Sequence, residues 1–226
     1  MIPLPSPPEK LDRPYVIVNC ASSADGKIAL PDGRQTRISS DDDMEFVHEL
    51  RNWADAVVVG IGTVLKDDPK LTVKEKYVKG PCHPLRVIID SCCRTPAGSE
   101  VLKEIAPTLI ATASDPWPLL EQPDNVEVIE CGDGKKVDLT ILLDNLWKRG
   151  VRRIMVEGGG TVISSFLAEC LVDEFMIFIG DMIIGGRDGP TPVMGRGAME
   201  FVNITRLERT GFYPMEKGVR IHYRVK

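Results

Sequence analysis

The sequence predicts an α/β fold of three layers with a mixed, mostly parallel sheet. Short apolar runs rich in β-branched residues alternate with segments of helical spacing, which is typical of strands joined by crossover helices. The last two apolar runs follow each other without a helix, so we expect an antiparallel pair at one end of the sheet. A chain of 226 residues is long enough for one buried core. We therefore expect a single domain over residues 13–226, preceded by a proline-rich arm over residues 1–12.

The first predicted strand is Tyr15 to Cys20, and the Asp25-Gly26 pair after it is typical of a turn. Ser39 or Ser40 is expected to cap the first helix, whose first turn carries three aspartates. The apolar face of this helix consists of Phe46, Val47 and Leu50.

Strands and helices continue to alternate along the middle of the chain. The predicted strands here are Val57–Val59, Leu85–Asp90, Leu109–Thr112 and Val126–Glu130. A short helix is expected at Pro116–Glu121. Asp138 is expected to cap a longer helix whose inward face consists of Leu139, Leu142, Leu143 and Leu146.

The C-terminal third begins with a strand at Arg153–Val156 that runs into a glycine-rich turn and then a helix near Ile163–Ala168. A further strand is predicted at Glu174–Gly180, followed by an exposed loop at Gly185–Pro190. The two final strands, expected to form the antiparallel pair, are Phe201–Glu208 and Val219–Val225.

Two glycine-bearing turns at strand ends predict a binding site. The valines of Val57–Val59 are typical of a strand buried on both faces, and Gly60 and Gly62 after them would let a polar or anionic ligand approach the backbone. The second strand ends in Gly158–Gly160, and the amides at the start of the next helix attract phosphate. Two such turns in one α/β chain predict one ligand of dinucleotide size, held by both.

Composition excludes several classes of function. The net charge is −5 and no basic tract stands out, so binding to nucleic acid is not expected. The six cysteines form no C-x-x-C pair and are expected to be reduced thiols of a cytoplasmic protein. Cys82-His83 lacks partners at ligand spacing, so no metal site is predicted. We expect neither a membrane span nor a signal peptide, because no stretch has the necessary apolar length.

The motifs that the sequence lacks exclude several kinds of catalytic chemistry. Neither glycine turn has the lysine and hydroxyl of a phosphate-binding P-loop. Gly60-Ile61-Gly62 begins like the common dinucleotide fingerprint, but Leu65 occupies the third glycine position and no acidic strand end follows at the expected interval. There is no G-x-S-x-G elbow, and none of the histidines stands beside an obvious nucleophile. Redox chemistry carried out by a bound nucleotide remains.

Several motifs, in order along the chain, resemble those of the riboflavin-biosynthesis reductase family, and the match is nearest to stand-alone archaeal members. They are Ser23–Ala29, Arg37–Ser39, Val59–Thr72, Arg86–Ser91, Glu157–Thr161 and Leu171–Glu174. The resemblance implies a dihydrofolate-reductase-like fold, NADPH as cofactor and a homodimer. It also implies reduction of the ribosylamino group of a pyrimidinone phosphate to ribitylamino, and for this reaction we expect the hydride to be delivered to the sugar C1′. The zinc deaminase motifs of bacterial relatives, H-x-E and P-C-x-x-C, are absent here.

The resemblance also implies site residues. The candidate catalytic residues are Glu157, at a substrate-contacting position of the family, and Asp68, which is chosen for its charge and not from the resemblance. The positions implied for NADPH are Ala21 through its backbone, Thr63, Asp67, Gly158, Gly159, Gly160 and Thr161. The positions implied for substrate are Leu71, Lys74 and Glu157. A carboxylate suits a ring that presents N–H donors, whereas Lys74 stands where bacterial relatives have arginine. Ser91, with Arg94, could receive the 2′-phosphate of NADPH, and Asp68 could favour an iminium electrostatically.

Each assignment has a plainer alternative. Asp67 or Asp68 would cap the local turn, Glu157 would cap a helix, and Arg94 would be a solvated cation. Asp25 would only stabilise the turn that it forms with Gly26. Three other functions stay open: a reductase of the deaminated pyrimidine, a dihydropteridine reductase on the same fold, and a nucleotide-binding regulator without catalysis.

Overall fold

The structure is a computed structural model that describes residues 2–113, 123–132 and 134–226. The strands in these ranges are β1 (Tyr15–Ser23), β2 (Ala56–Gly60), β3 (Leu85–Ile89), β4 (Thr108–Thr112), β5 (Val126–Glu130), β6 (Arg153–Gly158), β7 (Glu174–Gly180), β8 (Leu207–Met215) and β9 (Gly218–Val225). The helices are α1 (Asp41–Trp53), α2 (Ile61–Asp67), α3 (Leu139–Lys148) and α4 (Gly160–Ala168), with short 3-10 helices η1 (Glu100–Leu102) and η2 (Phe201–Asn203). The helix predicted at residues 116–121 lies outside the described residues.

The chain folds into two compact units. The first consists mainly of Val16–Val47 and Val156–Lys226, and the second consists of Leu4–Tyr15 and His48–Met155. Both α1 and β6 therefore contribute residues to each unit. Residues 4–12 of the predicted proline-rich arm belong to the second unit, and the single domain over residues 13–226 stays a prediction.

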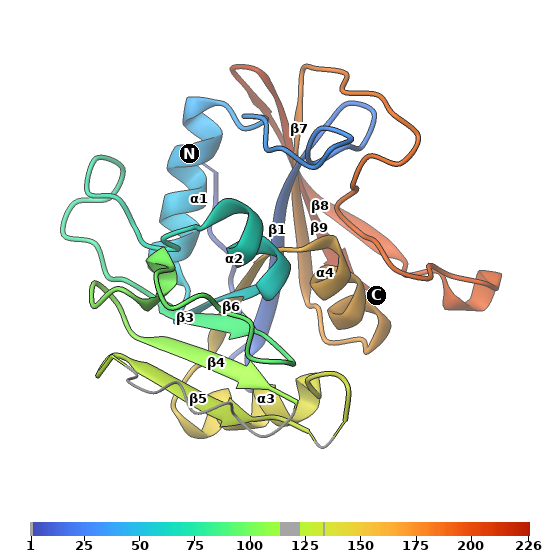
Figure 1. Cartoon of the computed structure of the whole chain (residues 1–226). Coiled ribbons are helices and arrows are strands. Elements are labelled where there is room, and N and C mark those ends of the chain that lie inside the picture. The colour runs from blue at the N-terminus through green and yellow to red at the C-terminus, as the bar shows by residue number, and fades with distance from the viewer. Residues whose placement is uncertain (1, 114–122, 133) are drawn as a thin grey trace. The chain divides into compact units, whose positions relative to one another are not determined.

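The second unit contains four parallel strands in the order β2-β3-β4-β5. Figure 1 shows β3, β4 and β5 side by side. Their carboxyl ends are level, with Ile89 paired to Ala111 and Thr112 paired to Glu130, and the end of β2 is level with them because Gly60 pairs with Ile89. β2 is buried along its whole length, as its block of valines predicts. The four strands predicted here are confirmed, with shifts of one residue at most at the ends of β2, β3 and β4.

The N-terminal cap and the leucine spacing of α3 are confirmed. The Asp138 carboxylate accepts the backbone N–H groups of Thr140 and Ile141 at 2.8 and 3.0 Å. Those N–H groups would otherwise lack acceptors, because the first turn of a helix has none of its own. The buried residues of α3 are the four predicted ones, Leu139, Leu142, Leu143 and Leu146.

A buried cation organises the segment that follows η1. Arg86 on β3 has no exposed surface, and its guanidinium donates to the carbonyl oxygens of Glu100 at 3.2 Å, Lys103 at 2.7 Å and Ala106. Burial lowers the pKa of this guanidinium to about 10. The Asn125 amide also donates to the carbonyl of Lys103, at 3.0 Å. Buried backbone carbonyls need such partners, so these side chains hold the segment in place.

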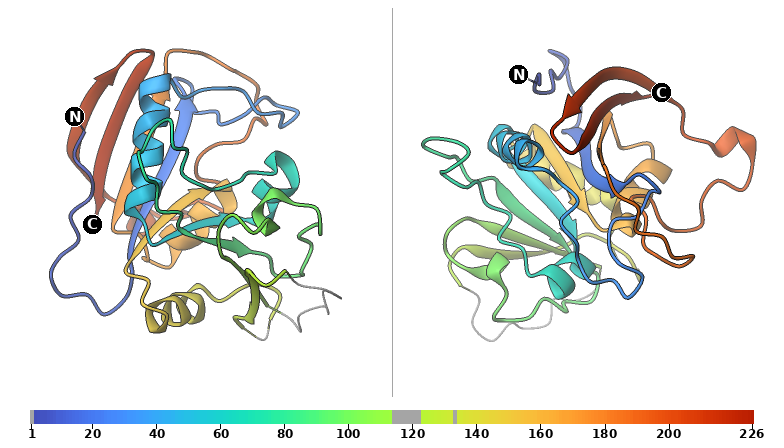
Figure 2. Two further views of the ribbon diagram at one scale, coloured as in Figure 1. Left: turned by 90° about the vertical axis from the view of Figure 1, so that its left-hand side faces the viewer. Right: turned by 90° about the horizontal axis from the view of Figure 1, so that it is seen from above.

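In the first unit the strand order is β1-β7-β9-β8, with β1 and β7 parallel and both later pairs antiparallel. The hairpin of β8 and β9 is drawn in red in Figure 2. β7 covers the residues predicted for it, and β1 continues to Ser23, three residues beyond its predicted end. The prediction of a mixed, mostly parallel sheet with an antiparallel end is therefore confirmed.

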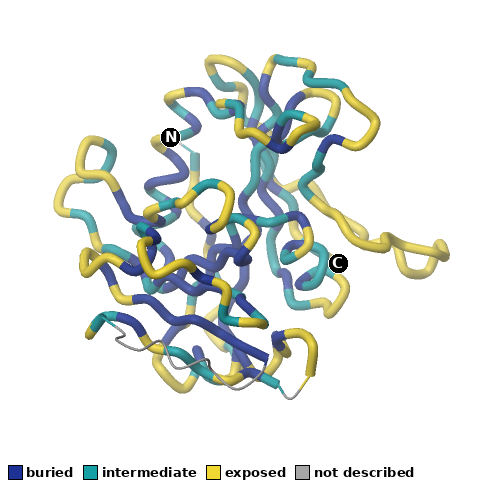
Figure 3. Tube along the Cα trace, viewed as in Figure 1, coloured by how far each residue is buried: buried dark blue, intermediate teal, exposed yellow. Residues whose placement is uncertain are grey.

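The position predicted for the first strand of the antiparallel pair is wrong. We expected Phe201–Glu208, but β8 is Leu207–Met215, and residues 201–203 form η2. Met215 pairs with Gly218 across a two-residue turn, so the hairpin determines the register. Pro214 lies within β8, which tolerates proline because it is an edge strand. The apolar residues near 201 are not core residues, because this segment is exposed (Figure 3).

The centre of the first unit holds a buried ion pair. Arg220 on β9 donates to Asp43 at 2.9 Å through Nε and to Asn19 at 2.7 Å, and both charged side chains have no exposed surface. The guanidinium lies over the Phe46 ring, 4.7 Å from its centroid. Asp43 comes from the first turn of α1, where its N–H lies 3.4 Å from the capping oxygen of Ser40. The predicted apolar face of α1 is buried and consists of Phe46, Val47 and Leu50.

Candidate active site

In the first unit, two of the predicted residues, Ala21 and Glu157, lie near the carboxyl ends of two neighbouring strands. β1 and β6 are adjacent, and the Tyr15 N–H donates to the Arg152 carbonyl at 2.7 Å, where both strands begin. Ala21 stands two residues before the end of β1, and Glu157 is the last residue but one of β6. Both are half-buried. Glu157 therefore comes just before the glycine-rich start of α4.

The glycine-rich turn is the beginning of α4 itself. Gly159 is its N-cap with φ of 82°, a conformation that favours glycine, and the Ile163 N–H bonds back to the Gly159 carbonyl at 3.1 Å. The helix starts at Gly160, three residues before the predicted start, because the last glycine and Thr161 join its first turn. The backbone N–H groups of this turn precede the first intrahelical bond and favour an anion.

A later loop of the same unit packs on this helix start. The Met194 N–H donates to the Gly160 carbonyl at 3.0 Å, and a Cβ at Gly160 would lie 2.6 Å from the Thr191 carbonyl oxygen. Gly195 is equally close to α4, because an ideal Cβ at Gly195 would lie 2.8 Å from the hydroxyl oxygen of Ser164. Sequence reasoning missed this contact, because nothing in residues 191–195 marks them as neighbours of α4.

Asp25 anchors a loop that is distant in sequence. Its carboxylate accepts the N–H groups of Ile184 at 3.1 Å and Gly185 at 2.7 Å, and the Ser23 hydroxyl at 2.6 Å. These hydrogen bonds, that of Ser23 first, lower the pKa of Asp25 to about 2. The structure thus supports the structural alternative for Asp25, and it shows that the carboxylate holds the loop at 184–185 as well as its own turn.

In the second unit, the predicted glycine turn after β2 is a helix. α2 begins directly at Ile61, and its N-cap Gly60 has an ordinary extended conformation with φ of −85°. Gly62 lies in the helix, and an ideal Cβ there meets nothing within 4 Å. The expectation that both glycines serve a turn is therefore wrong. β2 passes straight into helical geometry, which needs no glycine at either position.

The two aspartates of this motif have different surroundings. Asp67 is the last residue of α2 and, like Thr63, is half-buried. Asp68 is the left-handed C-cap with φ of 39°, and its exposed carboxylate accepts the Glu100 N–H at 2.8 Å. That contact supports the capping alternative for Asp68, because its carboxylate connects α2 to η1.

Leu71 and Lys74 lie in the segment after α2. The Leu71 side chain is only 2% exposed and its backbone is left-handed with φ of 53°, so it could meet a substrate only through its backbone. Lys74 is exposed, and its N–H donates to Nδ1 of the buried His48 at 3.2 Å. His48 was not predicted as a site residue, since a single histidine on a helix carries no signal of its own.

Ser91 follows β3, whose end is level with the start of α2. Its hydroxyl accepts the Val137 N–H at 3.3 Å. The neighbouring Asp90 is fully buried, and one of its oxygens accepts both the N–H and the hydroxyl of Thr95 at 2.8 Å. Arg94 is 58% exposed, with Nε 3.9 Å from Asp90. Both interpretations of Arg94, phosphate ligand and solvated cation, stay open.

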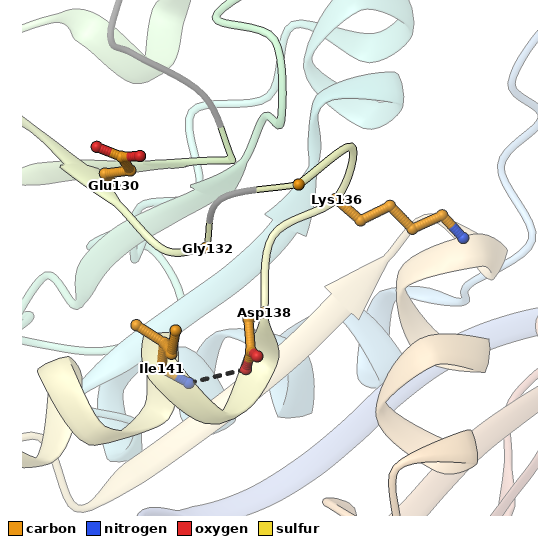
Figure 4. A pocket seen from close by; sticks show the side chains of 6 residues that line it. Glu130, Gly132, Lys136, Asp138 and Ile141 are labelled. Atoms are coloured by element: carbon orange, nitrogen blue, oxygen red, sulfur yellow. Dashed lines mark hydrogen bonds between the residues drawn. The ribbon is translucent and has the colours of Figure 1, made fainter.

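A hollow of about 550 Å³ lies at the carboxyl end of β5 (Figure 4). Its lining consists of Glu130, Gly132, Gly134, Lys136, Asp138 and Ile141. Figure 4 shows the Glu130 and Lys136 side chains pointing to opposite sides, and the Asp138 carboxylate is occupied by its cap bond to Ile141. None of the predicted site residues lines this hollow.

The described residues show no cluster of three or more histidine, cysteine or acidic side chains that could hold a metal ion. His83, considered with Cys82 in the sequence, accepts the Val73 N–H through Nδ1 at 3.3 Å. The six cysteines all lie in the described ranges, and none of them forms a disulfide. No helix within the described ranges has the apolar length to cross a bilayer.

Residues 14–221 match the RibD C-terminal domain, and the chain therefore belongs to that family. Within the family it is 44% identical to a protein of Archaeoglobus fulgidus named 2,5-diamino-6-ribosylamino-4(3H)-pyrimidinone 5′-phosphate reductase, over 88% of this chain and 94% of the relative. A protein of the same name from Methanothermobacter thermautotrophicus is 43% identical over 95% of this chain and 99% of the relative.

Solved structures agree with this family. A Thermotoga maritima diaminohydroxyphosphoribosylaminopyrimidine deaminase/5-amino-6-(5-phosphoribosylamino)uracil reductase is 30% identical with a TM-score of 0.79, covering 95% of this chain and 57% of that one. A Saccharomyces riboflavin biosynthesis reductase has a TM-score of 0.77 at 23% identity, over 97% of this chain and 93% of that one, which is evidence of fold alone. The predicted dihydrofolate-reductase-like fold is confirmed.

Proposed function

We propose that the chain is an NADPH-dependent reductase that converts the ribosylamino group of 2,5-diamino-6-ribosylamino-4(3H)-pyrimidinone 5′-phosphate to ribitylamino. The observation that carries this proposal is the 44% identity to the A. fulgidus reductase of that substrate over 94% of its length. The related T. maritima protein is named for a uracil substrate instead. The deaminated pyrimidine is therefore the competing substrate to test.

The start of α4 fits the diphosphate of a nicotinamide dinucleotide. Gly159 turns the backbone with φ of 82°, and the helix after it is nine residues long, so aligned amides face an incoming anion. When bound, NADPH supplies a hydride. We assign its binding to Ala21, Thr63, Asp67, Ser91, Gly158, Gly159, Gly160 and Thr161. The Asp67 carboxylate accepts from hydroxyl or carboxamide groups of the cofactor, and the Ser91 hydroxyl donates to its 2′-phosphate. The bare amides of α4 face the diphosphate.

The substrate is assigned to three residues of different chemistry. The half-buried Glu157 carboxylate accepts from the amino and ring N–H groups of the pyrimidinone. The exposed Lys74 ammonium offers a point charge to the 5′-phosphate. Leu71 contributes backbone contacts, because its side chain is buried. Asp68 is exposed and anionic, so it stabilises a developing cation at the sugar while it holds Glu100.

The direct test follows the absorbance of NADPH with the diamino and the deaminated pyrimidine phosphates side by side. We expect oxidation of NADPH with the diamino substrate and appearance of the ribitylamino product. Turnover of the deaminated compound alone would assign the enzyme to the later step. Binding of NADPH without turnover of either compound would indicate a regulator, and turnover of dihydrofolate alone would indicate a dihydropteridine reductase.

Glu157→Gln tests the substrate carboxylate. Hydrogen bonds to a charged group contribute about 1.5–3 kcal/mol, so we expect kcat/KM for the pyrimidine to fall roughly tenfold to a hundredfold. The dissociation constant for NADPH should stay near the wild-type value. Loss of NADPH binding with unchanged handling of the substrate would contradict this assignment.

We also propose that the protein is a cytoplasmic homodimer. Large apolar side chains are exposed near β8, with Phe201 87%, Val202 82% and Phe212 55% accessible, and such surfaces are typical of protein contacts. Six cysteines without a disulfide support a reducing compartment. Sedimentation velocity should show a dimer that Phe201→Ser weakens. A monomer at micromolar concentration would contradict the proposal.

A further inference from the structure

The second unit contains a buried histidine that the proposed mechanism does not use. His48 on α1 has no exposed surface, and its Nδ1 accepts the Lys74 N–H at 3.2 Å. A neutral imidazole that accepts at Nδ1 carries its proton on Nε2. Among the described residues, Nε2 has no hydrogen-bond partner. Burying such a donor is unfavourable, so the ring is a poor choice for packing alone.

His48 belongs to a set of three α1 side chains that hold one segment. Arg51 donates to the Thr72 carbonyl at 3.1 Å, and the Asn52 side-chain oxygen accepts the Cys82 N–H at 2.8 Å. Positions 48, 51 and 52 have the spacing of a single helix face. The contacts reach both ends of residues 72–82, which we call the clasped loop. Side chains of α1 therefore determine the path of this loop.

Lys74 is the first exposed residue of the clasped loop. The two residues before it, Thr72 and Val73, are only 6% and 3% exposed, so the chain reaches the surface at Lys74. Its N–H is bound to the buried ring at this point. The direction in which the lysine side chain leaves the backbone is thereby determined by His48.

Aromatic packing restrains the same ring from another side. Tyr77 of the clasped loop stacks on His48, with 4.7 Å between ring centroids and 18° between planes. Lys76 lies over the Tyr77 ring, with Nζ 4.2 Å from its centroid. Burial first, and then the charges of Arg51, Lys74 and Lys76, lower the pKa of His48 to about 4. The imidazole is therefore neutral near pH 7 and keeps Nδ1 available as an acceptor.

We propose that His48 is a positioning residue: through its hydrogen bond to the Lys74 N–H it holds the clasped loop so that the Lys74 ammonium meets the 5′-phosphate of the substrate. This proposal rests on the proposed function, which supplies the phosphate. His48 itself touches neither substrate nor cofactor in this assignment. Its effect should depend on the position of one acceptor atom and on the presence of a phosphate.

Two amide substitutions form a matched pair for the test. His48→Asn places its side-chain oxygen near the position of Nδ1, whereas His48→Gln places it near the position of Nε2. We expect His48→Gln to raise KM for the phosphorylated substrate roughly fivefold to tenfold, the effect of one lost hydrogen bond. Its kcat and KM for NADPH should change little. His48→Asn should restore KM toward the wild-type value.

Two further measurements separate positioning from general damage. With a substrate that lacks the 5′-phosphate, His48→Gln and the wild type should have equal KM values. In a Lys74→Ala background, His48→Gln should add no further loss, because the two residues act through the same contact. If His48→Gln does not fold, His48→Phe, which keeps the stacking on Tyr77, replaces it.

The possible results distinguish the positioning role of His48 from the proposed function. Equal KM values for the Asn and Gln variants, or additive losses with Lys74→Ala, would overturn the role of His48 while leaving the proposed function intact. A wild-type enzyme that binds NADPH but turns over no ribosylaminopyrimidine phosphate would overturn the proposed function, and the positioning role with it.

Discussion

Replacement of Gly160 by alanine should destabilise the protein, although alanine is the better helix former. Gly160 is the first residue of α4, and an ideal Cβ there lies 2.6 Å from both Met194 Cγ and the Thr191 carbonyl oxygen. The Met194 side chain is 43% exposed and can rotate away. The Thr191 oxygen belongs to the backbone, so it moves only if its loop moves.

The structure sets the size of the effect. To reach ordinary contact the loop must retreat from 2.6 Å to at least 3.4 Å from the new methyl group. Overpacking of this kind costs about 1–3 kcal/mol. Loss of the Met194 N–H bond to the Gly160 carbonyl adds about 1 kcal/mol, and the helix propensity of alanine returns a similar amount. We expect the free energy of unfolding to fall by about 1–3 kcal/mol.

Gly62→Ala is the matched control. Gly62 also lies in the first turn of a helix, but nothing approaches its ideal Cβ within 4 Å. Alanine there should raise the free energy of unfolding by about 0.5–1 kcal/mol. Urea unfolding followed by far-ultraviolet circular dichroism measures both variants. A Gly160→Ala protein as stable as the wild type, or equal losses in both variants, would refute the reasoning.

Two further predictions concern buried and exposed charges. Arg86→Met should reduce the free energy of unfolding by about 3 kcal/mol, because three backbone carbonyls lose the guanidinium as a donor and only those of Lys103 and Ala106 keep a bond from Asn125. Urea unfolding measures this change, and the exposed Arg94→Met should cost no more than about 0.5 kcal/mol. Asp25 has its pKa lowered from 3.8 to about 2, so its hold on the Gly185 N–H is complete above its unfolded pKa and is lost as pH falls through 2. Asp25→Asn should speed hydrogen exchange at Gly185 at neutral pH, whereas Asp188→Asn should not; equal exchange in all three proteins would contradict the anchoring role.

Much of the fold could be predicted from local sequence. Asp138 and the four leucines after it specify α3, because a cap and one apolar face are properties of a ten-residue window. The valines of β2 and the apolar runs of β5 and β7 specify strands for the same reason. The glycines of residues 158–160 likewise indicate a helix start that suits an anion.

The candidate site is predictable only in part. The motif around Asp67 and Asp68 predicts a binding region, but it does not show that the Asp68 carboxylate accepts the Glu100 N–H, 32 positions away. Asp25 binds a loop 160 positions away, and nothing near it in sequence announces that partner. The role of His48 depends on a bond across 26 positions. Such partners are known only once the chain is folded.

The sequence by itself determined the class of fold, the order of most strands and helices, and the family to which the chain is similar, because these depend on local periodicity and on contiguous motifs. Tertiary structure decided the position of β8, the difference between Gly62 and Gly160, and the partners of Asp25, Asp68 and His48. The physical reason is that a hydrogen bond or a steric contact requires two groups to meet in space. Only the folded chain brings together groups that are far apart in sequence.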